Sequence, residues 1–270
     1  MKHHQVPLSL ALSSLLLGIC GLPQRALADG PAVSALSGKV SVQGGDMNGK
    51  NASSADGVLT IPIGQLFGLQ IDGSSGRFID ESYKGLGGHF FWRDPSVGLV
   101  GATSSHQVLG GQGNTRSGAE GEAYFSNYTV IARAGGQTGD GSHGAYEGLG
   151  GRWYVTDNLS LNAGFDHSPG VVNTVGIGVE WQPMSWGLPP GLTLFARGTH
   201  SEASASIGNS HAVSVGVRYY FGAPKSLILH HRTDDPDSIV MPLGDVIPTP
   251  TIAPAPAPAP APVVHVVVPG

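Results

Sequence analysis

The stretch Val213-Ser-Val-Gly-Val-Arg-Tyr-Tyr-Phe221 decides the fold, because an extended strand divides it into two unlike faces. A charge that faces the bilayer midplane costs about 2–4 kcal/mol, so Arg218 must point away from lipid. The opposite face then meets the lipid, and it ends in aromatic rings that suit the membrane interface. This face carries Val213, Val215, Val217, Tyr219 and Phe221.

Four other segments repeat this glycine-spaced alternation with an aromatic end, at residues 85–93, 118–125, 148–155 and 175–181. Compact turn formers follow the first three segments in chain order, a longer connection at 184–191 follows the fourth, and each leads into another strand. The connections at the opposite end, such as residues 110–117, are expected to be longer loops. Residues 39–43, 58–63 and 67–72 add three strands and bring the total to twelve. Pro62 argues against a strand at 58–63, and reading 58–72 as one long strand gives ten. We expect an all-β, closed antiparallel transmembrane barrel of about twelve strands, with ten as the alternative.

From about residue 38 to 222 the chain resembles Gram-negative outer-membrane β-barrel proteins of the porin-like superfamily. The run from Val213 to Phe221 is similar to the C-terminal signal by which the barrel-assembly machinery recognises such proteins. The resemblance implies an integral outer-membrane barrel, with outer-membrane lipid and that machinery as partners and both termini in the periplasm. One departure is that the chain continues for about fifty residues beyond a signal that usually ends the protein.

The chain begins with a predicted secretory signal peptide over residues 1–28. Lys2 supplies the positive charge, an apolar core follows, and the small-x-small motif at residues 26–28 predicts cleavage between Ala28 and Asp29. The single cysteine, Cys20, lies within this signal, so the mature chain has no disulfide framework and no thiolate metal site. We expect a short periplasmic segment at 29–37, the barrel at 38–222 and a periplasmic tail at 223–270.

Composition supports the outer membrane and excludes nucleic acid as a partner. The chain has 14 basic and 19 acidic residues and 42 glycines. Loss of Lys2 and Arg25 with the signal leaves 12 basic residues and a net charge of −7. The mean hydropathy of +0.03 fits a barrel, because apolar and polar residues alternate along its strands and their hydropathies average out. No apolar run after residue 28 is long enough for a spanning helix.

Charged residues of both signs fall on the inward faces of the expected strands, and they form the candidate functional site. We expect Glu122 to pair close to Arg133 in register across the turn at Asn127, and Glu180 to lie diagonal to Arg197. Such ion pairs fill a narrow lumen, or they form a charged constriction that selects small solutes; twelve strands do not decide between the two. The network comprises Glu120, Glu122, Arg133, Arg152, Asp166, Glu180, Arg197 and Arg218.

These features favour a non-enzymatic barrel that is a small passive solute channel or a structural envelope protein. A surface adhesin is an alternative, and a rim-located lipid A or phospholipid hydrolase is a weaker one. The candidate catalytic pairs of such a hydrolase are His167-Ser168, His200-Ser201, or His200 with Asp166. Adjacent strand residues point to opposite faces, so neither His-Ser pair can make a contact within a regular strand. Nothing in the sequence calls for a catalytic, cofactor or metal site.

After Gly222 the alternation stops. Residues 223–238 are polar and include His230-His231 and Asp234-Asp235, for which a periplasmic segment is favoured over weak zinc binding. Proline alternates with alanine at 254–262, a pattern that favours extended polyproline II rather than helix or strand. We expect a disordered Pro-Ala tail; the alternative is an arm that docks on a periplasmic partner or the cell wall.

Overall fold

The computed structural model of the chain describes residues 30–140, 142–169, 172–184, 186–203, 209–234 and 236–237. The predicted signal peptide with its cleavage position at Ala28 and Asp29, and the Pro-Ala segment of the tail, lie outside these residues. The strands are β1 (Ser37–Met47), β2 (Lys50–Ile63), β3 (Phe67–Phe78), β4 (Glu81–Asp94), β5 (Gly98–Leu109), β6 (Gln112–Phe125), β7 (Tyr128–Gly139), β8 (Ser142–Thr156), β9 (Leu159–Ser168), β10 (Val172–Trp181), β11 (Leu192–Ala203) and β12 (Ser210–Phe221).

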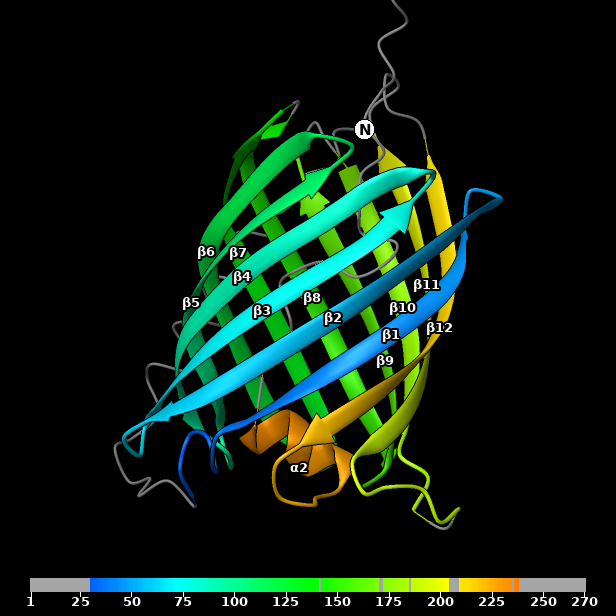
Figure 1. Cartoon of the computed structure of the whole chain (residues 1–270). Coiled ribbons are helices and arrows are strands. Elements are labelled where there is room, and N and C mark those ends of the chain that lie inside the picture. Colours follow the sequence, from blue (N-terminus) through cyan, green and yellow to red (C-terminus); the bar gives the residue numbers. More distant parts are fainter. Residues whose placement is uncertain are drawn as a thin grey trace, which may run out of the picture.

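These twelve strands form a closed antiparallel barrel of steeply tilted strands (Figure 1), which confirms the twelve-strand prediction over the ten-strand alternative. Each strand pairs with its neighbours in sequence, and β1 pairs with β12 to close the wall, with Gly38 opposite Phe221. Pro62 is tolerated in β2 because the pairing of β1 with β2 ends at Ser37 and Thr60. At Pro62 the strand therefore has a neighbour on only one side, where a missing N–H is tolerated.

The two ends of the barrel differ in chemistry. Aromatic residues gather at the end that also holds the start of β1 and the end of β12; Phe67 pairs with Trp92 there, and Tyr128 lies between Phe125 and Trp153. We call this the aromatic end. At the far end the β1–β2 hairpin turns tightly: Asn48 and Gly49 have φ of 55° and 79°, as two-residue hairpin turns require.

The expectation of long loops at the far end is wrong for residues 110–117. Only Gly110 and Gly111 form that turn, and β6 begins at Gln112. The segment reads as a loop because it is rich in Gly, Asn, Thr and Ser, yet its residues pair in register with β5. Ser117 even hydrogen-bonds Ser104 on the outer face at 2.9 Å. At the far end β5 and β6 carry polar residues on both faces, so they extend beyond the apolar, lipid-facing part of the wall.

The faces of the last strand alternate as the sequence predicts. Val213 and Val215 are about 60% exposed on the outside of the barrel, and Ser214 and Tyr220 are buried on the inside. Phe221 lies over Gly38 of β1, where a Cβ atom would stand 2.5 Å from the Phe221 ring. The segment proposed as an assembly signal is therefore the closing strand of the barrel.

Inward glycines make room for rings rather than for an open lumen. A Cβ atom on Gly118 or on Gly135 would stand 2.8 Å from Tyr146, which lies across both. Phe195 lies over Gly216 in the same way, and Phe91 over Gly68. Glycine at these inward positions thus serves in part to seat aromatic side chains against the wall.

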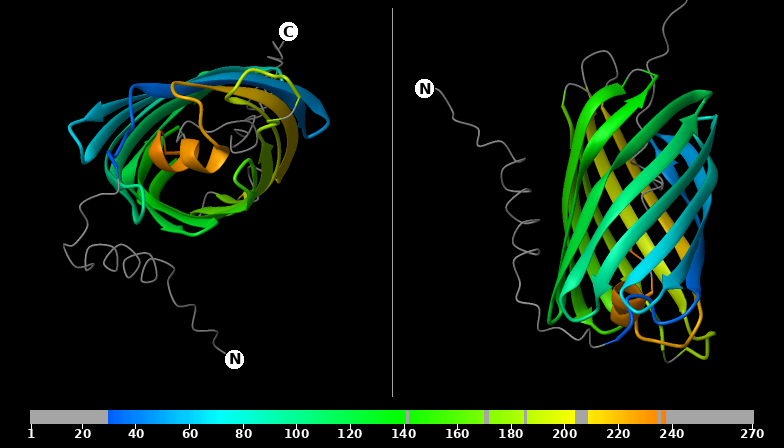
Figure 2. Two further views of the ribbon diagram at one scale, coloured as in Figure 1. Left: turned by 90° about the horizontal axis from the view of Figure 1, so that it is seen from below. Right: turned by 90° about the vertical axis from the view of Figure 1, so that its left-hand side faces the viewer.

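The chain segments outside the wall return to the aromatic end. Ala32 and Val33 are buried there, and Val33 packs with Phe91, Leu99 and Tyr124. The helix α2 (Leu227–Thr233) lies within the opening when the barrel is viewed along its axis (Figure 2, left). No helix among the described residues is long and apolar enough to cross a membrane. The polar segment that follows β12 is therefore docked on the barrel over residues 223–234 and 236–237.

Candidate functional site

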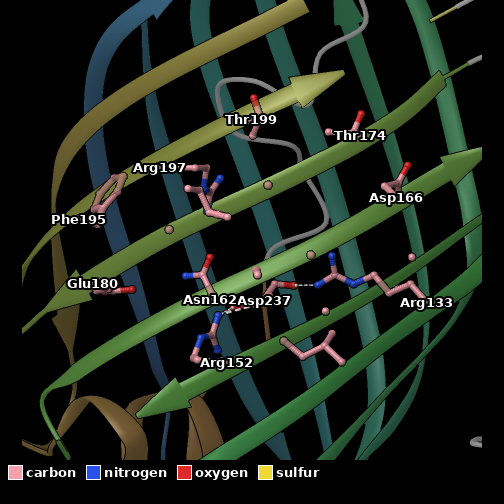
Figure 3. A pocket seen from close by; sticks show the side chains of 18 of the residues that line it. Arg133, Arg152, Asn162, Asp166, Thr174, Glu180, Phe195, Arg197, Thr199 and Asp237 are labelled. Atoms are coloured by element: carbon pink, nitrogen blue, oxygen red, sulfur yellow. Dashed lines mark hydrogen bonds and ion pairs between the residues drawn. The ribbon is translucent and has the colours of Figure 1, made fainter. Parts of the chain in front are cut away.

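The lumen contains a cavity of about 280 Å³ whose walls come mainly from β7–β12 with β1 and β2 (Figure 3). Strand alternation points every second side chain of these strands into it. Six basic side chains of the described barrel wall line the cavity, against three acidic ones. The basic residues are Lys39, Arg116, Arg133, Arg152, Arg197 and Arg218, and the acidic ones are Asp56, Asp166 and Glu180.

The predicted balance of positive and negative charge does not extend to this cavity, because Glu120 and Glu122 lie outside its lining. Glu120 is 2.7 Å from Nδ1 of His89, whose Nε2 is 3.0 Å from Asp72, and all three side chains are almost fully buried. Glu122 accepts a hydrogen bond of 2.9 Å from the Tyr124 hydroxyl. With two of the predicted carboxylates held elsewhere, the cavity wall carries an excess of positive charge.

Glu122 lies near Arg133 in register, two positions from the residue directly opposite it. Glu120 lies opposite Arg133, because the turn has two residues and Tyr128 already pairs with Phe125 as part of β7. With β6 ending at Phe125, a turn longer by two residues would have been needed to place Glu122 opposite Arg133. Glu122 instead lies opposite Ile131.

Glu180 and Arg197 are diagonal, as predicted, since Phe195 lies opposite Glu180. The carboxylate of Glu180, however, pairs with Arg218 of β12 at 2.6 Å. The long Arg218 side chain reaches across β11 at Thr193, whose hydroxyl also donates to Glu180 at 2.7 Å. The guanidinium of Arg218 lies 4.8 Å from the centre of the Phe195 ring. Asp166 is paired too, with Arg116 at 3.4 Å.

Asp237, which follows α2, supplies a fourth carboxylate to the cavity from outside the wall. Nη2 of Arg152 donates to both of its carboxylate oxygens at 2.7 Å, and Nη2 of Arg133 donates to its main-chain oxygen at 3.0 Å (Figure 3). Burial opposes its ionisation, but Arg152, Lys39 and Arg133 hold the pKa of Asp237 well below its usual range. It is therefore a carboxylate at every physiological pH.

The helix α2 is fixed to the wall by buried polar contacts. Nδ1 of His231 is 3.1 Å from the Tyr154 hydroxyl, and its Nε2 is 3.0 Å from the Tyr220 hydroxyl. His230 stacks on the Tyr220 ring with 4.5 Å between centroids. Burial, together with the nearby Arg152 guanidinium, lowers the pKa of His231 to about 3, so its imidazole is neutral near pH 7.

A second set of contacts holds the outer face of α2 to the turns. Arg232 donates to the main-chain oxygens of Phe125, Ser126 and Tyr128 at 2.6–3.2 Å. Its guanidinium also lies 5.2 Å from the centre of the Tyr124 ring. At the other end of the helix the backbone N–H of Leu227 donates to the Asn158 side chain at 3.3 Å.

Sequence reasoning missed several residues that build this site. Lys39, Asp56 and Arg116 lie on strands whose two-residue alternation places their side chains on the lumenal face. His231 and Asp237 carry no such pattern. They stand in a polar, proline-containing segment whose docking depends on contacts more than 70 residues away in sequence.

The histidine–serine pairs considered for hydrolysis are not brought together as catalytic pairs. His167 bonds Asn173, whereas Ser168 bonds Arg116 at 3.2 Å. His200 is 3.8 Å from Glu202, and Ser201 bonds Thr174 on the inner face. Within the described residues no group of three or more His, Cys, Asp or Glu side chains is placed to hold a metal ion.

No family model and no curated protein matches the sequence. Solved structures resemble its fold: a KdgM porin in complex with disordered oligogalacturonate has a TM-score of 0.52 at 11% identity, over 68% of this chain and 99% of that chain. Another KdgM porin structure gives 0.51 at 11% over the same shares, and Omp33 of Acinetobacter baumannii gives 0.47 at 13%, over 69% and 98%. At these identities the likeness concerns the fold alone. The chain therefore shares the closed β-barrel fold of the KdgM porin structures.

Proposed function

We propose that the protein is a non-enzymatic outer-membrane barrel that acts as a passive channel for small anionic solutes. The excess of basic over acidic wall side chains around the lumenal cavity carries this proposal. Arginine donates charge-assisted hydrogen bonds to carboxylate, phosphate and sulfate groups, and these bonds are stronger inside a barrel than in water. The oligogalacturonate named with the KdgM porin is likewise a polyanion, which agrees with this solute class.

The orientation in the membrane is part of the same proposal. We place the aromatic end, with residues 30–36 and α2, in the periplasm, because chain ends lie on that side in bacterial barrels. The barrel-assembly machinery would then recognise β12 from the periplasm during insertion. The tail beyond Asp237 remains a candidate arm for a periplasmic partner or the cell wall.

The docked C-terminal segment favours a second candidate, a structural envelope protein whose lumen is filled. Helix α2 occupies the opening at the aromatic end, and several of the lumenal charges are paired with one another. This candidate predicts a barrel that inserts into bilayers without conducting.

Planar-bilayer recordings of the full mature chain separate the two candidates. In a KCl gradient the channel should show a zero-current potential of the sign for anion preference, and Arg197→Ala should reduce it. Arg197 lines the cavity, whereas Lys50 is exposed beside the β1–β2 turn, so Lys50→Ala is the matched control. Verified insertions without conductance would support the structural candidate, and cation preference would contradict the anionic assignment.

A further inference from the structure

Asp237 offers two different acceptors to two guanidinium groups on neighbouring strands. Arg152 of β8 bonds both carboxylate oxygens, and Arg133 of β7 bonds the main-chain carbonyl of the same residue. The two arginines project from paired strands, with Arg152 opposite Thr129 and Arg133 opposite Gly148. Two guanidinium groups on neighbouring strands thus bind a carboxylate and the carbonyl next to it.

Asp237 does not satisfy all the hydrogen-bond donors of Arg133 and Arg152. The Nε atoms of Arg133 and Arg152 are both buried, and neither has a hydrogen-bond partner within the described part of the chain. A guanidinium has five N–H donors, and an unpaired buried donor is costly. Asp237 therefore leaves part of the hydrogen-bonding capacity of the two guanidinium groups unused.

The residue that fills the site belongs to a docked segment and not to the wall. Asp237 follows α2, which contacts the wall through Tyr154, Tyr220 and the turn carbonyls bonded by Arg232. The carboxylate side chain is 32% exposed to the cavity, whereas Arg152 is 10% exposed. Its removal would leave the strand pairing of the barrel unchanged, and its position would become available to a solute.

We propose that Arg133 and Arg152 form a binding site for a carboxylate that bears a nearby carbonyl acceptor, and that Asp237 occupies this site as an internal ligand. Solutes of this class, such as N-acylated amino acids and small acidic peptides, compete with the C-terminal segment for the same two guanidinium groups. Binding of such a solute displaces Asp237 and loosens α2 from the aromatic end. This inference deepens the proposed channel function by naming the solute class, and it rests on that function only for its role in transport.

Two probes of nearly equal size, one with a side-chain carboxylate and one with a neutral carboxamide, test the site on the purified full mature chain in detergent. N-acetyl-aspartate amide reproduces the groups that Asp237 presents, and N-acetyl-asparagine amide lacks the negative charge. Titration calorimetry should show that Asp237→Asn binds the aspartate probe at least tenfold more tightly than the wild type does, because the tethered competitor is gone. The asparagine probe should bind at least tenfold more weakly to the same variant.

Arg152→Gln should abolish binding of the aspartate probe, and Lys50→Gln, beside an outer turn, should leave it unchanged. Heat-modifiable gel migration shows which variants are folded. Asp237→Asn alters no strand residue, so the affinity comparison stands even where Arg152→Gln does not fold. A second readout is thiol labelling of Leu227→Cys: Leu227 is fully buried, and the mature chain contains no other cysteine. Saturating aspartate probe should speed this labelling at least fivefold.

Equal affinity of the wild type and Asp237→Asn would overturn the proposal, and so would absence of binding to both or equal binding of the two probes. The failure of the proposed function looks different. Tight binding by Asp237→Asn in a barrel that does not conduct would leave the site standing and remove the channel. Anion-selective conductance without probe binding would support the channel and rule out the binding site.

Discussion

Glu180 of β10 and Arg218 of β12 form an ion pair of 2.6 Å across the intervening strand β11. Both side chains are largely buried, with 6% and 16% of their surfaces exposed. Removal of one partner leaves a buried charge without compensation, which costs roughly 3–5 kcal/mol. We therefore expect Glu180→Gln to lower the free energy of unfolding by about that amount, measured by urea unfolding in lipid vesicles with tryptophan fluorescence.

The Lys50–Asp80 pair at the far end supplies the control for this prediction. Its side chains are 53% and 75% exposed, so water screens the pair. Asp80→Asn should leave the unfolding midpoint unchanged. If Glu180→Gln unfolds at the same urea concentration as Asp80→Asn, the pair across β11 has no role in stability.

The packing of Tyr146 across Gly118 and Gly135 predicts a second effect on stability. A methyl group on Gly118 would stand 2.2 Å from the Ala134 carbonyl oxygen and 2.8 Å from the Tyr146 hydroxyl. Overpacking of this kind costs about 1–3 kcal/mol, so Gly118→Ala should lower the free energy of unfolding by that amount. Gly73→Ala is the matched control in a strand, because nothing lies within 4 Å of the added methyl group. Equal stability of the two variants would show that the ring and the backbone move aside freely.

The docking of α2 should weaken in acid because of His231. The docked imidazole faces Tyr154 and Arg152 of β8, Glu180 of β10 and Tyr220 of β12, and it has a pKa of about 3 against an ordinary value of 6.5. Above pH 6.5 the imidazole is neutral whether α2 is docked or released, so docking has no proton cost. Below pH 6.5 the released form takes up a proton that the docked form does not, and docking weakens as the pH falls towards 3. From pH 7 to pH 5 this amounts to roughly 20-fold in the docking equilibrium.

A spin label at Leu229→Cys reports this change, since Leu229 is 47% exposed on α2 and labelling there leaves the docked face intact. The mobile component of the spectrum should grow as the pH falls from 7 to 5. In the His231→Gln background the spectrum should not depend on pH over this range. A pH dependence that survives the substitution would assign the effect to another group.

The alternation of residues was sufficient to predict the wall, and it also predicted where the inward charges lie. The last strand illustrates this, because Arg218 among valines has only one face that lipid tolerates. Register was harder to predict. The two-residue turn at Ser126 and Asn127 places Glu120 opposite Arg133, whereas a turn longer by two residues would place Glu122 there, and both turns suit the same residue types.

The C-terminal segment could not be predicted in this way. His231 and Asp237 dock because Tyr154, Tyr220 and Arg152 from distant strands converge at one end of the barrel. No local periodicity encodes such long-range contacts, and the nearby prolines favour an extended chain. Likewise, the excess of basic side chains in the cavity lining arises only after folding places His89 beside Glu120 and keeps that carboxylate out of the lining.

The closing strand gives the last prediction. Phe221 ends β12 at the aromatic end and covers Gly38, so its ring both meets the interface and fills the seam between β12 and β1. Phe221→Ala should reduce the folded fraction in the outer membrane severalfold, as measured by heat-modifiable migration of membrane fractions. Truncation after Ser238 keeps α2 and Asp237 and should leave insertion close to that of the full chain. Phe125→Ala is the control for the loss of an interfacial ring alone, because Phe125 is 56% exposed on β6, away from the seam. Insertion that survives Phe221→Ala but is lost on truncation would move the assembly determinant from β12 into the tail.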